Sequence, residues 1–415
     1  MATAVQNKGF SSASSSGINI CPNTVLSVLI LTSLVFVSLF GRNSVLIFLC
    51  AGLVLYLRRP DLAKEEIRLF WWLYLLPVWC MASLLWSDHP DLSLRHGLQL
   101  AITFMIAITV ANRLSPIIFL RVLFAALMVA GVASLLFGNT REDGIWLGIF
   151  ASKNYYAFTM VALVLASLAL LIDRRETLLW RLGGATGTLL GLPQIIKAES
   201  IGAVIAVVFV LSAAMVILAT QAFAPARRLK VLGIFAGLAL LSVLISIYFM
   251  DTVLAIVIEI TGKDPSLTGR TDLWLYAVDE ISRSPMLGTG YRAFWVEGNP
   301  LAEQIWAEFY IASKSGFNFH NMFLSNAVDV GLIGVAISLS LMIPAFVLCI
   351  LWSLKVGGAP ALFCFMAATF VIVLSMVEVP VFFEFDALTV ILIGSLVYGL
   401  RASREIPQTA DAANA

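Results

Sequence analysis

Residues 331–353, GLIGVAISLSLMIPAFVLCILWS, run for 23 positions without one charged side chain. A helix of about 20 apolar residues crosses the hydrocarbon core of a bilayer. The same character recurs along the chain, since 60% of its residues are hydrophobic and only 12% are charged. An average soluble domain carries about 25% charged residues. The sequence therefore predicts an all-α, polytopic helical membrane protein.

Twelve apolar runs are expected to cross the membrane, although the second, fourth and last are short. They are 24–41, 43–57, 69–86, 97–111, 116–137, 153–172, 178–196, 201–219, 231–250, 331–353, 361–379 and 386–400. Strands are not expected, because the runs are continuous and do not alternate. The polar stretches 1–23 and 401–415 are predicted to be disordered tails on either side of a single membrane domain, 24–400.

The distribution of basic residues predicts the orientation. With a cytoplasmic N-terminus, the inside segments hold sixteen Lys and Arg residues and the short outside loops hold five. Short loops rich in basic residues stay in the cytoplasm. We therefore expect both termini inside and the one long loop, 251–319, outside. The formal net charge of +1 gives no reason to expect a nucleic-acid partner.

The long loop is unusually aromatic. Its aromatic residues include Trp274, Tyr276, Tyr291, Phe294, Trp295, Trp306 and Tyr310. Two interpretations stay open at this stage. The rings can form an interfacial aromatic belt, or some of them can stack on the C–H faces of sugar rings.

Four candidate site residues lie at or near the outer ends of spans: Lys153, Lys197, Arg270 and His320. A charge near the bilayer is costly, so it usually faces the bundle interior or a wet cavity. Three cations that converge on one membrane face suit an anion, and diphosphate is the anion that lipid carriers present there. Arginine can bind phosphate oxygens with both arms of its planar fork.

Each candidate also has a purely structural interpretation. The two lysines suit snorkelling boundary residues, the arginine suits pairing with Asp272 or Asp279, and the histidine suits an ordinary interfacial position. Four carboxyl groups are also predicted to face outward and to balance the cations or orient an acceptor. They are Glu199, Glu378, Glu384 and Asp386. His89 and His96 receive no predicted role, and no spacing predicts a metal or a cofactor.

Several motifs resemble the bacterial O-antigen ligase and polymerase superfamily. His320-Asn321, nine residues, and then Gly331-Leu332-Ile333-Gly334 resemble its signature. The segments GIFASKN, WSD, GRTDLW and SPMLGTGY also resemble family motifs, and they occupy residues 148–154, 86–88, 269–274 and 284–291. Asn154 belongs to the first of them. The resemblance covers about residues 70–400, and GRT with Ala293-Phe294-Trp295 is most similar to the exopolysaccharide-polymerase subgroup.

One position departs from the family pattern. Many members carry Ser-Arg or Ser-Lys where this chain has Ser200-Ile201. Lys197 precedes this position by four residues, about one helical turn. We expect Lys197 to substitute for the absent cation.

The resemblance implies a membrane-embedded (GT-C-type) glycosyltransferase of the bacterial inner membrane. Its donor is a polyprenyl-diphosphate-linked glycan, and it transfers to a sugar hydroxyl at the periplasmic face. We expect Arg270 and Lys197 to stabilise the diphosphate, with Lys153 assisting. We expect His320 to act as general base, since imidazole is the side chain best suited to that task near neutral pH. Asn321 and the two glycines complete the motif.

Polymerisation of repeat units into an exopolysaccharide is the favoured activity. The alternative is an O-antigen ligase that uses the lipid A core as acceptor. A flippase or transporter for lipid-linked oligosaccharide is the third possibility, but such proteins often have internal repeats and none is evident here. A chain-length regulator and a flippase are the expected protein partners.

Overall fold

The computed structural model describes residues 21–221 and 269–413, together with isolated positions between 223 and 237. The first half of the described chain contains α1 (Pro22–Val35), α2 (Val37–Phe40), α3 (Arg42–Leu57), α4 (Pro60–Phe70), α5 (Leu75–Ala82), α6 (Pro90–Arg113) and α7 (Pro116–Phe137). There follow β1 (Asn139–Thr140), β2 (Trp146–Gly148), α8 (Lys153–Ile172), α9 (Leu178–Lys197), α10 (Ile201–Thr220), α13 (Arg270–Arg283), α14 (Pro300–Glu308), α15 (Met322–Lys355), α16 (Ala359–Leu374) and α17 (Ala387–Ala413).

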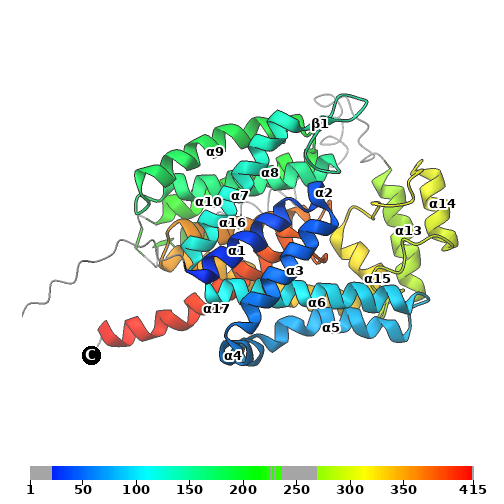
Figure 1. Ribbon diagram of the computed structural model, residues 1–415, viewed down its shortest axis with the longest axis horizontal. Helices are drawn as coiled ribbons and strands as arrows, with labels where there is room; N and C mark the ends of the chain where they lie inside the picture. The colour runs from blue at the N-terminus through cyan, green and yellow to red at the C-terminus, as the bar shows by residue number, and fades with distance from the viewer. Residues whose placement is uncertain are drawn as a thin grey trace, which may run out of the picture.

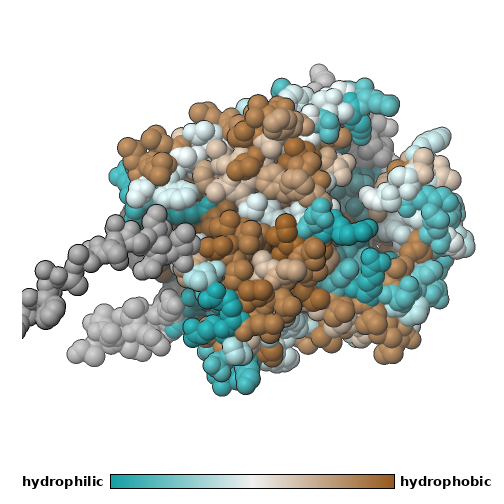
Figure 2. Space-filling view, in the orientation of Figure 1, coloured by the Kyte–Doolittle hydropathy of each residue, from teal (hydrophilic) through white to brown (hydrophobic). Residues whose placement is uncertain are grey.

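The helices form one bundle, which is consistent with an all-α polytopic membrane protein (Figure 1). Within the described residues, seven helices are long and apolar enough to cross a membrane, and α1, α3 and α16 are shorter apolar helices beside them. Figure 2 shows a broad apolar face over the middle of the bundle, with hydrophilic residues gathered toward its two ends. Such a band is the surface that lipid chains cover.

Helices α8, α16 and α17 occupy the centre of the bundle. Nearly every residue of α16 from Ala359 to Val371 is buried, and so is most of α8. Helix α8 packs closely on α9, whose Gly184, Gly187 and Gly191 face it. A Cβ on Gly184 would lie 2.4 Å from the carbonyl oxygen of Ser167. Small residues at this spacing let two membrane helices approach closely.

The helix ends differ from the sequence prediction at several places. The expected span 69–86 is the end of a longer unit, Pro60–Leu85, which is broken by one-turn 3-10 helices at Trp71–Tyr74 and Ser83–Leu85. The expected span 331–353 begins earlier, at Met322, because polar residues in its first turns hide a helix from a hydropathy argument. The predicted disordered tail 401–415 is also wrong, because α17 continues to Ala413.

A small β-hairpin lies between two of the apolar runs, and within the described residues the runs themselves contain no strand, as expected. The strands β1 and β2 pair in antiparallel fashion at the end of α7, with Asn139 opposite Gly148. They hold the GIFASKN segment against the bundle. The expected span 231–250 and the first part of the long loop, 251–268, lie largely outside the described residues.

The second half of the long loop is a small folded unit. Helices α13 and α14 lie beside the end of the bundle (Figure 1) and enclose a core of their own. Phe294, Trp306 and Phe319 are buried in that core, and Trp295 packs between them with its ring centroid 4.9 Å from that of Phe319. These aromatic rings are therefore mainly packing residues of the outer unit.

Candidate active site

One buried carboxylate, Glu378, joins three of the residues that the sequence singles out. It lies on the segment between α16 and α17, and its side chain is 6% exposed. Its Oε1 accepts hydrogen bonds from Arg270 Nη2 at 2.6 Å and Asn154 Nδ2 at 3.0 Å. Its Oε2 lies 2.9 Å from His320 Nδ1. The partners are 108, 224 and 58 residues away in sequence, so the fold alone brings them together.

The contact with Glu378 fixes the role of each imidazole nitrogen of His320. An ionised carboxylate can only accept a hydrogen bond. Nδ1 of His320 therefore carries the proton and donates the hydrogen bond. In the neutral ring Nε2 is then an acceptor. The side chains of His320 and Arg270 are 25% and 21% exposed. A basic nitrogen and a guanidinium are therefore presented side by side at the edge of a buried anion.

Backbone geometry holds His320 in place. Its φ is +47°, in the left-handed region that non-glycine residues rarely adopt. Its N–H donates to Asn318 Oδ1 at 2.7 Å. Strain of this kind costs about 1–3 kcal/mol and gathers at functional sites. The ring also meets Phe317 edge to face, with 5.8 Å between centroids.

Asn321 has a structural role that accounts for the His-Asn pair. Its Oδ1 caps α15 by accepting from the N–H groups of Phe323 and Leu324. Its Nδ2 donates to the carbonyl of Met376 at 3.0 Å, and the N–H of Met322 donates to the carbonyl of Ser375. The start of α15 is thus fastened to the segment that carries Glu378.

Asn154 ties two more helices to the same carboxylate. It lies in the first turn of α8, after Ser152, whose hydroxyl accepts from the N–H of Tyr155. Ser200, at the start of α10, donates to Asn154 Oδ1 at 3.0 Å. At the Ser200-Ile201 pair, where this chain departs from the family pattern, the serine therefore still reaches the site.

The two candidate lysines lie next to this cluster. Lys153 precedes Asn154 and donates to the carbonyl of Glu199 at 3.4 Å. Lys197 lies three residues before Ser200, and its Nζ is 4.1 Å from the centre of the Trp146 ring. A cation over a tryptophan face is attracted by the ring electrons. The structure thus brings Arg270, His320 and Asn154 together, and places the lysines on the adjoining helix ends.

Gly331 and Gly334 are structural. Gly331 interrupts α15 with φ +70° and ψ 179°. A Cβ there would lie 2.1 Å from the carbonyl oxygen of Met286. The SPMLGTGY segment fills the break, because the N–H of Leu332 donates to the carbonyl of Pro285 and Thr289 N–H donates to that of Val328. At Gly334, a Cβ would approach the Val330 side chain within 2.3 Å.

The segment between α16 and α17 is itself well fixed. Asp386 Oδ2 accepts from the N–H of Thr389 at 2.7 Å, and the hydroxyl of Thr389 accepts from the N–H of Phe382. Burial raises the pKa of Asp386 to about 6. Of the four carboxyl groups predicted to face outward, Asp386 caps α17. Glu378 instead contacts the predicted site residues Arg270 and His320.

The structural interpretation of Arg270 as a partner of Asp279 is wrong, since Asp279 pairs with Arg283 at 2.7 Å. Sequence reasoning left Glu378 among several carboxyl groups. One signal was available: Glu378 lies in a run that is otherwise apolar, between Val377 and Val379. Among the residues that the structure describes, no group of three or more His, Cys, Asp or Glu is arranged to hold a metal.

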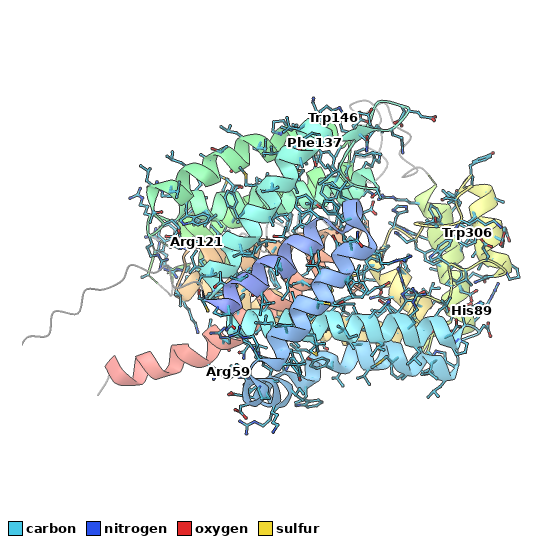
Figure 3. All side chains as sticks on the ribbon, in the orientation of Figure 1. Arg59, His89, Arg121, Phe137, Trp146 and Trp306 are labelled. Carbon is cyan, nitrogen blue, oxygen red and sulfur yellow. The ribbon has the colours of Figure 1, made fainter. Side chains whose placement is uncertain are left out.

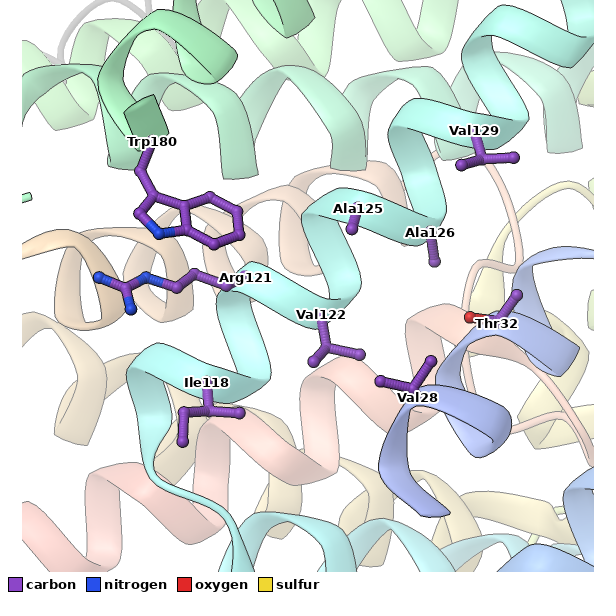
Figure 4. Close-up of a pocket in the computed structure, with 9 residues that line it drawn as sticks. All are labelled: Val28, Thr32, Ile118, Arg121, Val122, Ala125, Ala126, Val129 and Trp180. Atoms are coloured by element: carbon purple, nitrogen blue, oxygen red, sulfur yellow. The ribbon is translucent and has the colours of Figure 1, made fainter. Parts of the chain in front are cut away.

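Figure 3 relates the site to the rest of the bundle. Trp146, His89 and Trp306 lie toward one end of the molecule, and Arg59 and Arg121 toward the other. At that second end, a groove of about 450 Å³ runs between α1, α7 and α9 (Figure 4). Apolar side chains line it, and Arg121, at its end, pairs with Glu176 at 2.6 Å. Its lining suits hydrocarbon chains and does not include Glu378.

The fold and the site define a multi-pass membrane protein with a polar cluster at one end of its helix bundle. Residues 187–339 match the O-antigen ligase family model. The chain is also 31% identical to the exopolysaccharide production protein ExoQ of Rhizobium meliloti (strain 1021), over 317 residues, which are 74% of this chain and 71% of that protein. The chain belongs to this family, and the similarity supports a ligase- or polymerase-type role in exopolysaccharide synthesis.

Proposed function

We propose that this protein polymerises polyprenyl-diphosphate-linked oligosaccharide repeat units into an exopolysaccharide at the periplasmic face of the inner membrane. The observation that carries the proposal is the junction of Arg270, His320 and Asn154 on Glu378. The similarity to an exopolysaccharide production protein supports the polymerase.

In the reaction, His320 Nε2 takes the proton of the acceptor hydroxyl. The acceptor oxygen bonds to the anomeric carbon of the donor, and the bond from that carbon to the diphosphate oxygen breaks. The electron pair leaves with the diphosphate. Fixed cations stabilise charge that develops on a leaving group, and Arg270 would do so here, with Lys197 and Lys153 on the adjoining helix ends. The chain supplies these cations itself, so the proposal invokes no metal.

Glu378 is a positioning residue in this scheme. It orients the imidazole so that Nε2 faces the acceptor, and it stabilises the imidazolium that forms, as a carboxylate does beside a catalytic histidine. It also pairs with Arg270. The remaining guanidinium donors of Arg270 would then bind the diphosphate.

The second candidate function is O-antigen ligase, with the lipid A core as acceptor. The description of the matching family model favours it. The polysaccharides of a deletion strain separate the two. Loss of the secreted polymer with intact lipopolysaccharide supports the polymerase, whereas an unmodified lipid A core with normal secreted polymer would reject it in favour of the ligase.

A direct test uses the purified protein and a lipid-linked repeat unit. We expect His320→Ala to bind the donor nearly as the wild type does but to lose turnover by about 10²–10⁴-fold, the usual contribution of a positioned base. Retention of most of the turnover would reject His320 as the base.

A further inference from the structure

The segment between α16 and α17 carries a second carboxylate that is held in the same way as Glu378. Glu384 Oε1 lies 2.8 Å from His96 Nδ1 and 3.4 Å from Arg292 Nη2. The side chain of Glu384 is 11% exposed, whereas His96 and Arg292 are 20% and 38% exposed. One buried carboxylate again supports one imidazole and one guanidinium that reach solvent.

Four elements build this second cluster. His96 comes from α6 and Arg292 from the loop between α13 and α14. Asp329, which precedes the break in α15, accepts from the N–H of Arg292 at 3.3 Å. The guanidinium of Arg292 lies 4.9 Å from the centre of the Phe383 ring. Like His320, Arg292 is held in the left-handed region, with φ +61°. This backbone conformation is strained, and the surrounding structure must stabilise it.

The contacts of Glu384 determine what the cluster presents. Burial acts to raise its pKa, but the hydrogen bond with His96 and the charge of Arg292 hold the pKa below its usual range. The ionised group accepts from Nδ1 of His96, which leaves Nε2 as an acceptor. Its Oε2 is buried and has no hydrogen-bond partner within the described residues. Arg292 keeps further donors above an aromatic ring.

The charge balance indicates which ligand fits. Glu384 pairs with the guanidinium of Arg292, and Asp329 accepts from the backbone N–H of the same residue. The described contacts of this cluster include no lysine, whereas Lys153 and Lys197 adjoin the first cluster, so the second cluster suits a phosphate less well. A guanidinium fork and an imidazole acceptor instead suit the hydroxyl groups of an uncharged sugar.

The spacing from the first cluster fits a glycan as well. Glu378 and Glu384 are six residues apart on one segment, and six residues span at most about 20 Å. An oligosaccharide repeat unit of several sugars is long enough to reach from one cluster to the other.

We propose that His96 and Arg292, positioned by Glu384, form a second subsite that binds hydroxyl groups of the glycan, several sugars from the bond being made. The inference rests on the proposed function, because that function supplies the glycan. Glu384 acts through its two partners and does not itself touch the sugar.

Binding measurements with two probes test the proposal on the full-length protein in detergent. One probe is the oligosaccharide released by partial acid hydrolysis of the polysaccharide that the source organism secretes. The other is polyprenyl diphosphate without a glycan. We expect Arg292→Ala and Glu384→Gln each to weaken oligosaccharide binding about tenfold, which equals about 1.4 kcal/mol, and to leave polyprenyl diphosphate binding within about twofold of wild type.

Matched controls make the result specific. Arg283→Ala removes an exposed arginine of α13, and Glu303→Gln removes the charge of a half-buried carboxylate of α14 that pairs with Lys314. Both variants should bind the two probes normally. Arg270→Ala should show the reverse pattern, with weaker diphosphate binding. If Arg292→Ala does not fold, His96→Gln replaces it, with the same expected loss.

The second subsite is overturned by normal oligosaccharide binding in the folded variants, or by a loss confined to polyprenyl diphosphate. A wild-type protein that binds the diphosphate lipid but not the oligosaccharide overturns it too. A wild-type protein that binds neither probe overturns the proposed function itself, so the two failures are distinguishable.

Discussion

At the scale of single residues, the chemistry depends on which partners each of the two carboxylate oxygens of Glu378 binds. One oxygen serves Arg270 and Asn154, and the other serves His320. A carboxylate that is 6% exposed needs such partners, because an unpaired buried charge is very costly. The same group therefore keeps the site folded and sets the direction of the imidazole.

The first prediction concerns Glu378→Gln. We expect turnover to fall at least about tenfold, because the amide no longer fixes the tautomer of His320. The loss can approach the ~10²–10⁴-fold fall in turnover expected when a general base is removed. Donor binding should stay equal or become tighter, because Arg270 is freed from its ion pair. Initial rates and donor binding are measured separately, with Glu303→Gln as the control. Weaker donor binding with unchanged turnover would contradict this role.

The second prediction separates the charge of Arg270 from its shape. Arg270→Lys keeps the charge but loses the planar fork, so we expect activity to fall about tenfold. Arg270→Ala should fall further, toward the ~10²–10³-fold seen when one stabilising donor is removed. Polymer formation at several donor concentrations measures both. Equal activity of the lysine variant and the wild type would show that a point charge is sufficient.

At the scale of elements, the break in α15 decides how the outer unit docks. The SPMLGTGY segment lies against the open turn at Gly331, and Trp79 Nε1 donates to the carbonyl of Val330 at 2.9 Å beside it. The same segment leads to Arg292. The loop motif and the glycine motif thus belong to one joint, although they are far apart in the sequence.

The third prediction tests that joint with Gly331→Ala. The added Cβ meets backbone atoms of Met286 that cannot move aside, at 2.1 Å from the carbonyl oxygen. Gly316→Ala is the matched control, because Gly316 has φ +72° but no neighbour within 4 Å of its Cβ position. Both variants suffer the left-handed strain, so the apparent melting temperature in detergent should fall clearly more for Gly331→Ala. Equal falls would mean that docking does not need the glycine.

The fourth prediction uses the cap of α17. Since burial raises the pKa of Asp386 to about 6, above its ordinary value near 3.9, the folded protein binds its proton more tightly than the unfolded chain does. The stability that this proton gives is present at low pH and is lost as the pH rises through about 6. Asn caps a helix about as well as Asp and does not titrate.

We therefore expect the melting temperature of the wild type, relative to Asp386→Asn, to fall as the pH is raised from about 5 to about 7.5. Thermal unfolding of both proteins across this range is the measurement. A difference that does not change with pH would mean that Asp386 keeps an ordinary pKa.

At the scale of the whole molecule, the sequence indicates which end of the bundle carries the site, because short connections force successive spans to alternate in direction. Residues at outer helix ends, such as Asn154 and His320, are then expected to gather. The sequence does not indicate which of four outward carboxyl groups meets Arg270, since that depends on packing between segments 108 residues apart. For the same reason it gave no role to His96.

The last prediction is the orientation, which the basic residues suggest and which the proposed function requires. On a background in which the five free cysteines are replaced, Glu297→Cys places a thiol in the outer unit and Ser403→Cys places one beyond the apolar part of α17. Both positions are exposed. We expect a membrane-impermeant thiol reagent to label position 297 in cells whose outer membrane is permeabilised, and position 403 only after the inner membrane is opened. Glu297 is a better site than the neighbouring Gly298, whose φ of +90° would strain a cysteine. Labelling in the opposite order would place Glu378 and His320 on the cytoplasmic side and remove the basis for a periplasmic reaction.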